Sequence, residues 1–417
     1  MNGPTPQRRQ RLGRHSNAVA AVLSNAITAA SSFALQLVAA RSLGATGLGR
    51  FSLLTSILIT VAAVQSGWIG DSLTVLDRFA PATRAALLRS QKGAVVLALV
   101  FGVIGAAAFR ITGPGVALVF GVALALWLLE DTGRRLLMAR REFWKAVVND
   151  GTYAAAALGT VAVYLGTDHD LSLGTLVWAM AIGSGAACLA AAVQLPRHEL
   201  APSPSGTPVD MAGLSTFAVW RAAQIGLRPA TQFLMRALVA ASLSSAALGR
   251  LEAGRLLLAP VLVVINGAGL LLLPTYADRL RRGTFSLVSV RKAMLLLAGL
   301  ALAAGVAALV SASWVGPLVT GGSFEVSRLA IVSWTLLMAG FGAGIPAGLA
   351  LVAAEQPRQT FLVRTADSLL GLVLALAVVA LGEPDLAPAG LAVGAAVGAL
   401  WMFRRLRQAV PPAPAVP

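Results

Sequence analysis

The side chains best suited to hold a ligand lie together in one mostly apolar stretch in the middle of the chain. This stretch holds three cations, Arg221, Arg228 and Arg236, and two amides, Gln224 and Gln232. At about 100° per residue all five share one face of a helix, and the outer two arginines are ~22 Å apart along its axis. A guanidinium group binds phosphate or carboxylate oxygens in pairs. The stretch therefore predicts a ladder of cations that can hold an anionic group.

The position of Arg228 limits what this ladder can face. Arg228 lies near the middle of the stretch, where an arginine that faces lipid costs at least ~2.5 kcal/mol. The outer two arginines lie nearer the ends, from which a long side chain can reach the head groups. The ladder therefore faces either a water-filled cavity or a fixed carboxylate in a structural ion pair, and the sequence leaves both interpretations open.

Composition shows what kind of protein must position these residues. Hydrophobic residues make up 57% of the 417 positions and charged residues 12%, about half the ~25% typical of soluble domains. The apolar runs are about 18–25 residues long, enough to cross a ~30 Å hydrocarbon core as helices, and they lack the alternation of transmembrane barrels. We predict an all-α integral membrane protein with about twelve transmembrane helices. They begin near Asn17, Phe51, Gly93, Gly115, Ala146, Leu171, Leu214, Leu251, Ala293, Leu329, Phe361 and Leu386.

The distribution of basic residues predicts the orientation of these helices. With both termini in the cytoplasm, 24 of the 33 Lys and Arg residues fall on the cytoplasmic side, 6 on the opposite side and 3 inside the seventh span. This asymmetry is the positive-inside pattern. The net charge of +16 is then explained by topology. We expect a multi-pass protein of the cytoplasmic membrane with the lipid bilayer, and no nucleic acid, as its partner.

Nothing in the sequence predicts an enzyme, a cofactor or a metal site. Cys188 is the single cysteine, and the sequence has no cluster of Cys, His and carboxylate residues with metal-ligand spacing. No Gly-rich loop ends in the Gly-Lys-Ser/Thr of a nucleotide-binding site.

A short sequence occurs twice, 200 residues apart. Residues 40–64 and 240–264 align without gaps and are identical at nine positions, including a Ser-Leu pair and a Leu-Gly-Arg triplet. Coincidence between two short loops is the alternative. A true repeat predicts two six-helix lobes in the same orientation, related by a pseudo-twofold axis along the membrane normal. The predicted segments are a basic cytoplasmic N-terminus (1–16), an N-terminal lobe (17–195), a cytoplasmic linker (196–213), a C-terminal lobe (214–407) and a proline-rich tail (408–417).

Subtracting the same 200 residues from the positions of the arginine ladder gives positions in the first span. There the matching face is polar but uncharged, with Asn25, Thr28, Ser32 and Gln36. Such residues also bond neighbouring helices without any further role. If both faces border one space, it is a cleft between the lobes that is positive on one wall.

The positions of the carboxylates favour an anionic substrate for this cleft. Most of them fall at or near predicted cytoplasmic helix ends, and only Asp367 lies several residues inside a span; the others are Asp71, Asp77, Glu130, Asp131, Asp150 and Asp278. A carrier of cationic drugs would be expected to hold an acid deep in the membrane. Diphosphate or acidic sugar groups suit the arginines. Two stripes of glycines at four-residue spacing, 340–348 and 390–398, predict close helix packing.

Several segments resemble the polysaccharide-transporter branch of the multidrug/oligosaccharidyl-lipid/polysaccharide exporter superfamily. They are "ARSLGATGLGRFSLLTS" after the first span, "RRLLMARREFWKA" after the fourth and "ALGRLEAGRLLLAP" before the eighth. The resemblance implies a flippase that moves polyprenyl-diphosphate-linked oligosaccharide across the membrane by alternating access of a cationic inter-lobe cavity. It also implies glycosyltransferases or a polymerase as possible partners.

The chain departs from the pattern of this superfamily in carrying no charge inside its first span. Within the resemblance, this departure favours an O-antigen-like flippase over a lipid II flippase. An ion-coupled multidrug antiporter of the same superfamily and a non-transporting scaffold for glycosyltransferases are the alternatives.

Overall fold

The computed structural model describes residues 6–108, 111–167, 170–200, 206–354 and 356–409, and no strand occurs in these ranges. The helices in chain order are α1 (Pro6–Gln65), α2 (Asp71–Val75), α3 (Pro81–Ala108), α4 (Pro114–Ala139), α5 (Phe143–Gly166), α6 (Leu173–Gln194), α7 (Arg197–Leu200), α8 (Met211–Ser242), α9 (Ser245–Arg281), α10 (Leu287–Thr320), α11 (Arg328–Ala353), α12 (Pro357–Ala380) and α13 (Ala387–Ala409).

All twelve predicted spans are helical. The first two form a single element, α1, which breaks at Gly44 with φ 62° and ψ −168°, a conformation that glycine adopts without strain. The other ten spans correspond to α3, α4, α5, α6, α8, α9, α10, α11, α12 and α13. Within the described residues, nine helices are long and apolar enough to cross a membrane; α5 and α8 fall outside this set. The fold is therefore an all-α, multi-pass membrane fold.

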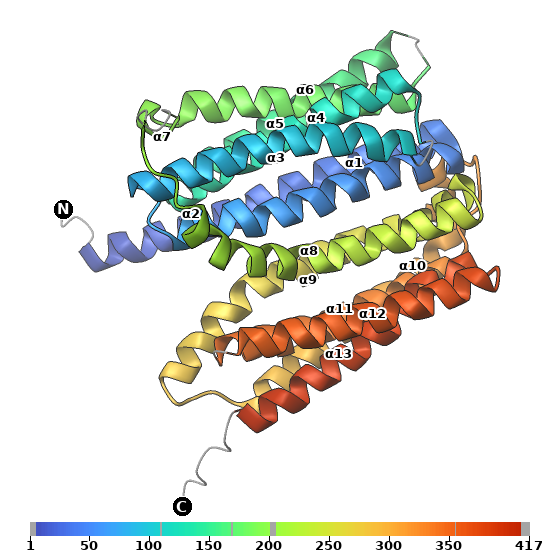
Figure 1. The fold of residues 1–417 in the computed structure, drawn as a ribbon. Coiled ribbons are helices and arrows are strands. Elements are labelled where there is room, and N and C mark those ends of the chain that lie inside the picture. Colours follow the sequence, from blue (N-terminus) through green and yellow to red (C-terminus); the bar gives the residue numbers. More distant parts are fainter. Residues whose placement is uncertain (1–5, 109–110, 168–169, 201–205, 355, 410–417) are drawn as a thin grey trace, which may run out of the picture. The chain divides into compact units, whose positions relative to one another are not determined.

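The helices form two compact units. Unit 1 consists of Met1–Leu35 and Leu54–Pro229, and unit 2 consists of Gln36–Leu53 and Ala230–Pro417. In unit 1, α4 packs on α3 and α6, and α5 packs on α6; in unit 2, α11 packs on α9, α10 and α13, and α12 packs on α13 (Figure 1). Helices α1 and α8 each contribute residues to both units.

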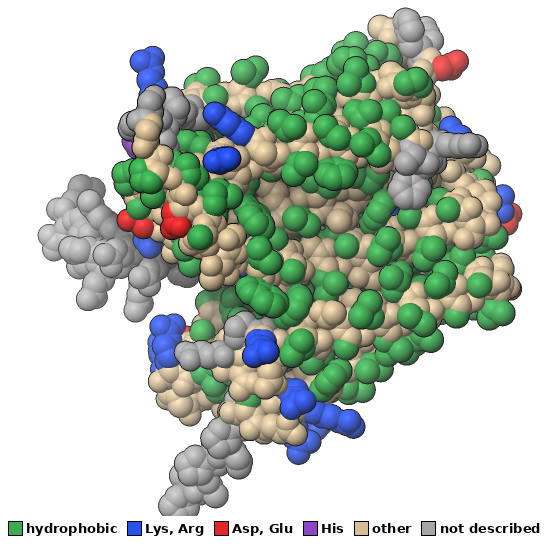
Figure 2. Space-filling view, viewed as in Figure 1, with side chains coloured by type: hydrophobic (Ala, Val, Ile, Leu, Met, Phe, Trp, Pro, Cys, Tyr) green, Lys and Arg blue, Asp and Glu red, His purple; other side chains and the backbone are tan. Residues whose placement is uncertain are grey.

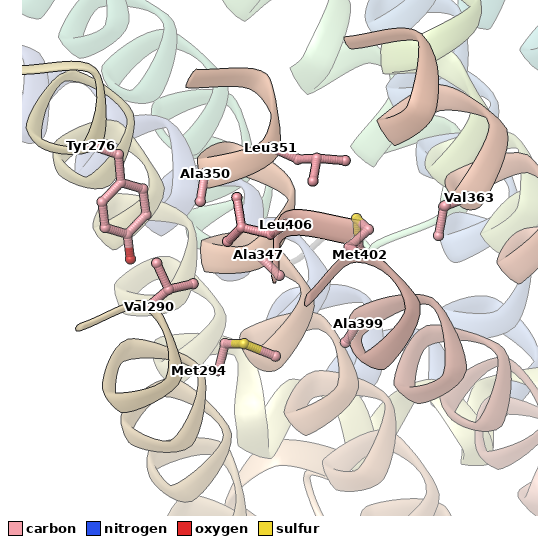
Figure 3. Close-up of a cluster of buried hydrophobic side chains, with 10 residues drawn as sticks. All are labelled: Tyr276, Val290, Met294, Ala347, Ala350, Leu351, Val363, Ala399, Met402 and Leu406. Carbon is pink, nitrogen blue, oxygen red and sulfur yellow. The ribbon is translucent and has the colours of Figure 1, made fainter. Parts of the chain in front are cut away.

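A cluster of buried apolar side chains joins five helices of unit 2 at one end. Tyr276 of α9, Val290 of α10, Leu351 of α11, Val363 of α12 and Leu406 of α13 all belong to it (Figure 3). Each of these side chains is at most 3% exposed. Burial of apolar side chains at this density fixes the five helix ends against one another.

The parts of the two copies that hold the Ser-Leu pair and the Leu-Gly-Arg triplet, 40–53 and 240–253, both lie in unit 2. The chain reverses at Gly44 in the first copy and at Ser244, which caps the N-terminus of α9, in the second. A Cβ added to Gly49 would collide with the carbonyl oxygen of Ser245, and one added to Gly249 would collide with that of Ala45. Each contact is the 200-residue shift of the other. The two copies therefore cross backbone to backbone, as a pseudo-twofold repeat predicts and coincidence does not.

The glycine stripes pack helices together, as predicted. On α13, a Cβ at Gly390 would meet the backbone of Ala375, and one at Gly394 would meet the backbone of Asp367. On α11, Gly344 leaves room for the guanidinium of Arg364. Small residues let helix backbones approach closely in membranes.

Hydrophobic side chains are spread over the face of the molecule shown in Figure 2. Helix α10 shows the pattern along its length, because Leu296, Val306, Val310 and Trp314 are each 61–72% exposed. An uncovered apolar face of this length is suited to lipid. The predicted linker and tail fall partly outside the described residues, at 201–205 and 410–417.

Candidate functional site

One arginine of the predicted ladder lies in a buried ion cluster of unit 2. The Nε of Arg236 donates to Oε1 of Glu252 at 2.7 Å, and its Nη2 donates to Oε2 at 3.4 Å. The Nε of Arg255 donates to the same Oε2 at 2.6 Å. The side chain of Glu252 is completely buried, and those of Arg236 and Arg255 are 8% and 15% exposed. One carboxylate thus serves two guanidinium groups, and these three groups carry a net charge of +1.

Two further side chains complete this cluster. Arg255 donates through Nη2 to Oε1 of Gln36, which lies on α1. The guanidinium carbons of Arg236 and Arg255 lie 5.4 and 5.9 Å from the ring centroid of Trp334, and the ring nitrogen of Trp334 donates to the carbonyl of Leu251. An aromatic face stabilises a cation at this distance. Gln36 and Arg236, which the 200-residue offset pairs, therefore meet at one place.

The helical hairpin formed by α8 and α9 positions the central ion pair. Ser244 stands at the reversal, and its hydroxyl accepts a hydrogen bond from the backbone N–H of Ala247. Arg236 and Glu252 lie at equal distances along the chain before and after Ser244. Two antiparallel helices that flank a tight turn have the same rise per residue, so Arg236 and Glu252 lie at the same distance from the turn along the helix axes.

A second arginine of the ladder pairs with an acid in unit 1. The Nη2 and Nε of Arg221 lie 2.6 and 2.8 Å from Oδ2 of Asp71, and its Nη1 donates to Oε1 of Gln224 at 2.9 Å. A π-helical turn at Ser66–Gly70 directly precedes Asp71, and its Gly67 packs against the backbone of Ala222, the neighbour of Arg221. This pair is more exposed than the first, with 40% of the Arg221 side chain accessible.

The polar face of the first span joins a different network. Asn25 accepts a hydrogen bond from Nη2 of Arg134 at 3.1 Å. The Nε of Arg134 also lies 3.2 Å from Oδ1 of Asp150, and Ser24 donates to the other oxygen of that carboxylate. Thr28 donates to the carbonyl of Ser24. These contacts tie α1, α4 and α5 together within unit 1.

The remaining predicted residues are half-buried: Arg228 and Gln232 on α8 and Ser32 on α1. Six of the nine predicted residues are thus distributed among three separate networks. For Arg221 and Arg236 the structure shows the ion-pair arrangement that the sequence left open. A role of any of the nine in substrate binding stays a prediction.

The expectation that only Asp367 lies several residues inside a span is wrong for Glu130, which lies well inside the candidate span Pro114–Ala139. Helix α4 continues to Ala139, so Glu130 lies two turns inside it, and α5 begins at Phe143, so Asp150 also lies two turns inside. Both carboxylates are buried, at 5% and 3% exposed. The Nδ2 of Asn149 donates to Glu130 at 2.9 Å. The error arose because the helices extend beyond the apolar runs that mark them in the sequence.

Sequence reasoning missed the residues that organise the main cluster, Glu252, Arg255 and Trp334. Glu252 is the second residue of the predicted eighth span, and a carboxylate at the end of a span does not by itself indicate a buried ion pair. Two signals were present: Glu252 and Arg255 are one helical turn apart, and Glu252 mirrors Arg236 about the turn at Ser244. Trp334 comes from α11 and gives no such local signal.

Comparison with known proteins places the fold. No family model matches the sequence, and no curated protein matches it. Solved structures do match. The lipid II flippase MurJ in an inward closed conformation aligns with a TM-score of 0.74 and 12% identity, over 94% of this chain and 87% of that one.

Two other structures align over similar lengths. An inward-facing multidrug-resistance MATE transporter of the MOP superfamily gives a TM-score of 0.67 at 12% identity, over 94% of this chain and 95% of that one. A MOP-superfamily transporter from Pyrococcus furiosus, described as having a binding pocket of reversed polarity, gives 0.57 at 12% identity, over 94% of both chains. At such identities the likeness concerns the fold.

Proposed function

We propose that this chain, which has the fold of the MOP-superfamily transporters, is a flippase for a polyprenyl-diphosphate-linked oligosaccharide. In this proposal a cationic cavity opens to each side of the membrane in turn and holds the diphosphate. The observation that carries the proposal is the cluster of Arg236, Arg255 and Glu252, in which one buried and one partly buried cation share a buried acid.

The chemistry of this cluster fits a phosphorylated substrate. Each guanidinium has five N–H donors in a planar fork. Glu252 and Gln36 take up part of these donors, and a diphosphate can accept others. Anion binding brings the local charge closer to neutrality, which a low-dielectric environment favours. The inter-lobe position of the cavity stays a prediction.

Arg228 is proposed as a second contact of the diphosphate. It lies on α8 between Arg221 and Arg236, beside Pro229. Neutralising it in Arg228→Gln is expected to abolish export while leaving abundance in the membrane normal, because glutamine keeps much of the side-chain volume. Arg228→Lys is expected to lose much of the activity too, since an ammonium lacks the fork.

Complementation tests this proposal. The chain is expressed in bacteria that lack their own O-antigen flippase, and surface polysaccharide and membrane abundance are measured for each variant. We expect export with the unchanged chain and none with Arg228→Gln at equal abundance. Full export by Arg228→Gln at normal abundance would contradict the role of Arg228, and absence of export by the unchanged chain across several oligosaccharide substrates would contradict the function.

One observation favours the ion-coupled drug antiporter as a second candidate. Glu130 and Asp150 are buried carboxylates inside helices of unit 1. Efflux of a lipophilic cation such as ethidium from cells that express the chain separates the two candidates. Efflux that Glu130→Gln abolishes supports the antiporter, whereas export without efflux supports the flippase.

A further inference from the structure

The end of unit 2 that holds the five-helix apolar cluster is surrounded by basic side chains. Nine Lys and Arg residues lie there, and we call them the basic end: Arg279, Arg281, Arg282, Arg291, Lys292, Arg358, Arg404, Arg405 and Arg407. All nine are exposed. Figure 2 shows part of this group at the lower left, where α9 ends, α10 begins and α13 ends in Figure 1.

The apolar cluster shows that these cations belong to one surface. Val290 is buried in it and is followed directly by Arg291, and Leu406 is buried in it between Arg405 and Arg407. Tyr276 and Val363 of the same cluster lie within five residues of Arg279 and Arg358. The cluster, drawn in Figure 3, holds these helix ends together, and the nine charges therefore belong to one end of the unit.

Few carboxylates of the protein neutralise the positive charge of the basic end. Of these nine residues, all of which the structure describes, only Arg282 lies within ion-pair distance of a described carboxylate, with its Nη2 3.0 Å from Oδ2 of Asp278. In the sequence, one further acid, Glu355, precedes Arg358 by three positions; it lies outside the described residues. Nine cations against two acids leave a net charge of +7.

The cytoplasmic helix ends of unit 1 differ, because acids there take up much of the positive charge. Glu142 lies between α4 and α5, and its pKa is lowered chiefly by the hydrogen bond from Lys145 and also by Arg140. Glu199 pairs with Arg140 at 3.2 Å and with Arg78 at 3.8 Å. The positive-inside rule requires basic residues on both units but does not require one end to be left uncompensated.

The apolar neighbours of the basic end indicate its depth in the membrane. On three helices an exposed apolar side chain lies four residues from a cation and so on the same face. These pairs are Arg291 with Leu295, Lys292 with Leu296, Arg358 with Leu362, Arg404 with Leu400, and Arg405 with Trp401. Along each of these helix faces, the exposed side chains change from apolar to cationic within about one turn. Such a change is expected at the boundary between the hydrocarbon core of a bilayer and its head groups.

We propose that the basic end of unit 2 is a binding surface for the phosphate head groups of anionic phospholipids in the surrounding bilayer. Cations from several helix ends share these head groups, so binding of anionic lipid braces α9, α10, α12 and α13 against one another. The location on lipid-facing helix faces favours lipid over an acidic segment of a partner protein. The surface is separate from the proposed substrate contacts.

The experiment titrates the purified full chain in detergent micelles with phosphatidylglycerol and measures the midpoint of thermal unfolding. We expect phosphatidylglycerol to raise the midpoint and zwitterionic phosphatidylcholine, inorganic phosphate and a poly-glutamate peptide to leave it nearly unchanged. Each basic residue near a membrane surface contributes about fivefold to the affinity for anionic lipid. The double variant Arg291→Gln/Arg404→Gln should therefore need about 30-fold more phosphatidylglycerol for half of the effect.

Two control variants accompany this measurement. Arg89→Gln/Lys92→Gln removes two exposed cations of α3 in unit 1 and is expected to change the half-effect concentration by less than about threefold, since they lie outside the basic end. Arg291→Lys/Arg404→Lys keeps the charges and should behave like the unchanged chain. Equal half-effect concentrations in all variants would overturn the proposal, as would protection by phosphatidylcholine or phosphate as strong as by phosphatidylglycerol. Protection by poly-glutamate alone would assign the surface to an acidic protein.

Discussion

Removal of the carboxylate of Glu252 tests the energetics of the buried cluster most sharply. In Glu252→Gln the guanidinium groups of Arg236 and Arg255 keep their positions, with 8% and 15% of their side chains exposed, but lose their shared counter-charge. Breaking a buried ion pair in this way costs ~3–5 kcal/mol because it leaves an uncompensated charge. We expect the free energy of unfolding to fall by about this amount.

Removal of Arg236 should cost less, and this asymmetry is the distinctive part of the prediction. In Arg236→Gln the carboxylate of Glu252 keeps its contact with Nε of Arg255 at 2.6 Å. The loss is then that of hydrogen bonds to a charged group, ~1.5–3 kcal/mol. The double variant Glu252→Gln/Arg236→Gln leaves one cation, bonded to Gln36, and should recover part of the stability lost in Glu252→Gln.

The assay is unfolding in mixed micelles with increasing SDS, followed by tryptophan fluorescence and by circular dichroism. Glu325→Gln is the matched control, because it makes the same chemical change at an exposed position and is expected to change stability by less than ~0.5 kcal/mol. A Glu252→Gln variant as stable as the unchanged chain, or more stable than Arg236→Gln, would refute the interpretation of Glu252 as the shared counter-ion.

Three further predictions concern the repeat, the ladder and the topology. Gly49→Ala and Gly249→Ala should each destabilise the protein by ~1–3 kcal/mol, because the new Cβ meets a backbone carbonyl. In the control Gly299→Ala the new Cβ meets nothing within 4 Å, so this variant should keep its stability. Thermal midpoints equal in all three variants would contradict the backbone-to-backbone crossing of the two repeat copies. Asp71→Asn should lower the free energy of unfolding by no more than ~1 kcal/mol, because the ion pair of Asp71 with Arg221 is partly exposed. A larger decrease, measured by unfolding in SDS, would show that this pair is fully desolvated. Reporter fusions after Arg407 and within 196–213 should both report cytoplasm, and an external signal from either would overturn the proposed topology.

The sequence was sufficient for most of the fold. The apolar runs predicted the helices, because a bilayer requires long helices that satisfy their own backbone hydrogen bonds, and nine of the described helices are long and apolar enough to cross one. The Leu-Gly-Arg triplets predicted the repeat, and the structure shows why those residues recur: Gly49 and Gly249 are where the two copies touch. The helix ends were less predictable, because α4 and α5 extend past their apolar runs and so bury Glu130 and Asp150.

The candidate site could be predicted only in part. Arg236 was identified from the helical periodicity of one span, and Gln36 from the 200-residue offset between the repeats. Both signals are read along the sequence and do not depend on how other helices pack. Their contacts with Arg255 and Trp334 depend on how α9 and α11 pack, which local sequence does not encode. Where two partners flank a tight turn, as Arg236 and Glu252 do, the sequence did hold the information.

Translocation by the purified chain is the most direct test of the proposed function. The chain is reconstituted into liposomes that carry a fluorescent polyprenyl-diphosphate-linked oligosaccharide in both leaflets, and an impermeant quencher is added outside. We predict that the inner pool becomes accessible with the unchanged chain, but neither with Arg228→Gln nor when the diphosphate of the lipid is replaced by an uncharged linkage. Accessibility no greater than in protein-free liposomes, or equal rates for the charged and uncharged lipids, would contradict the account.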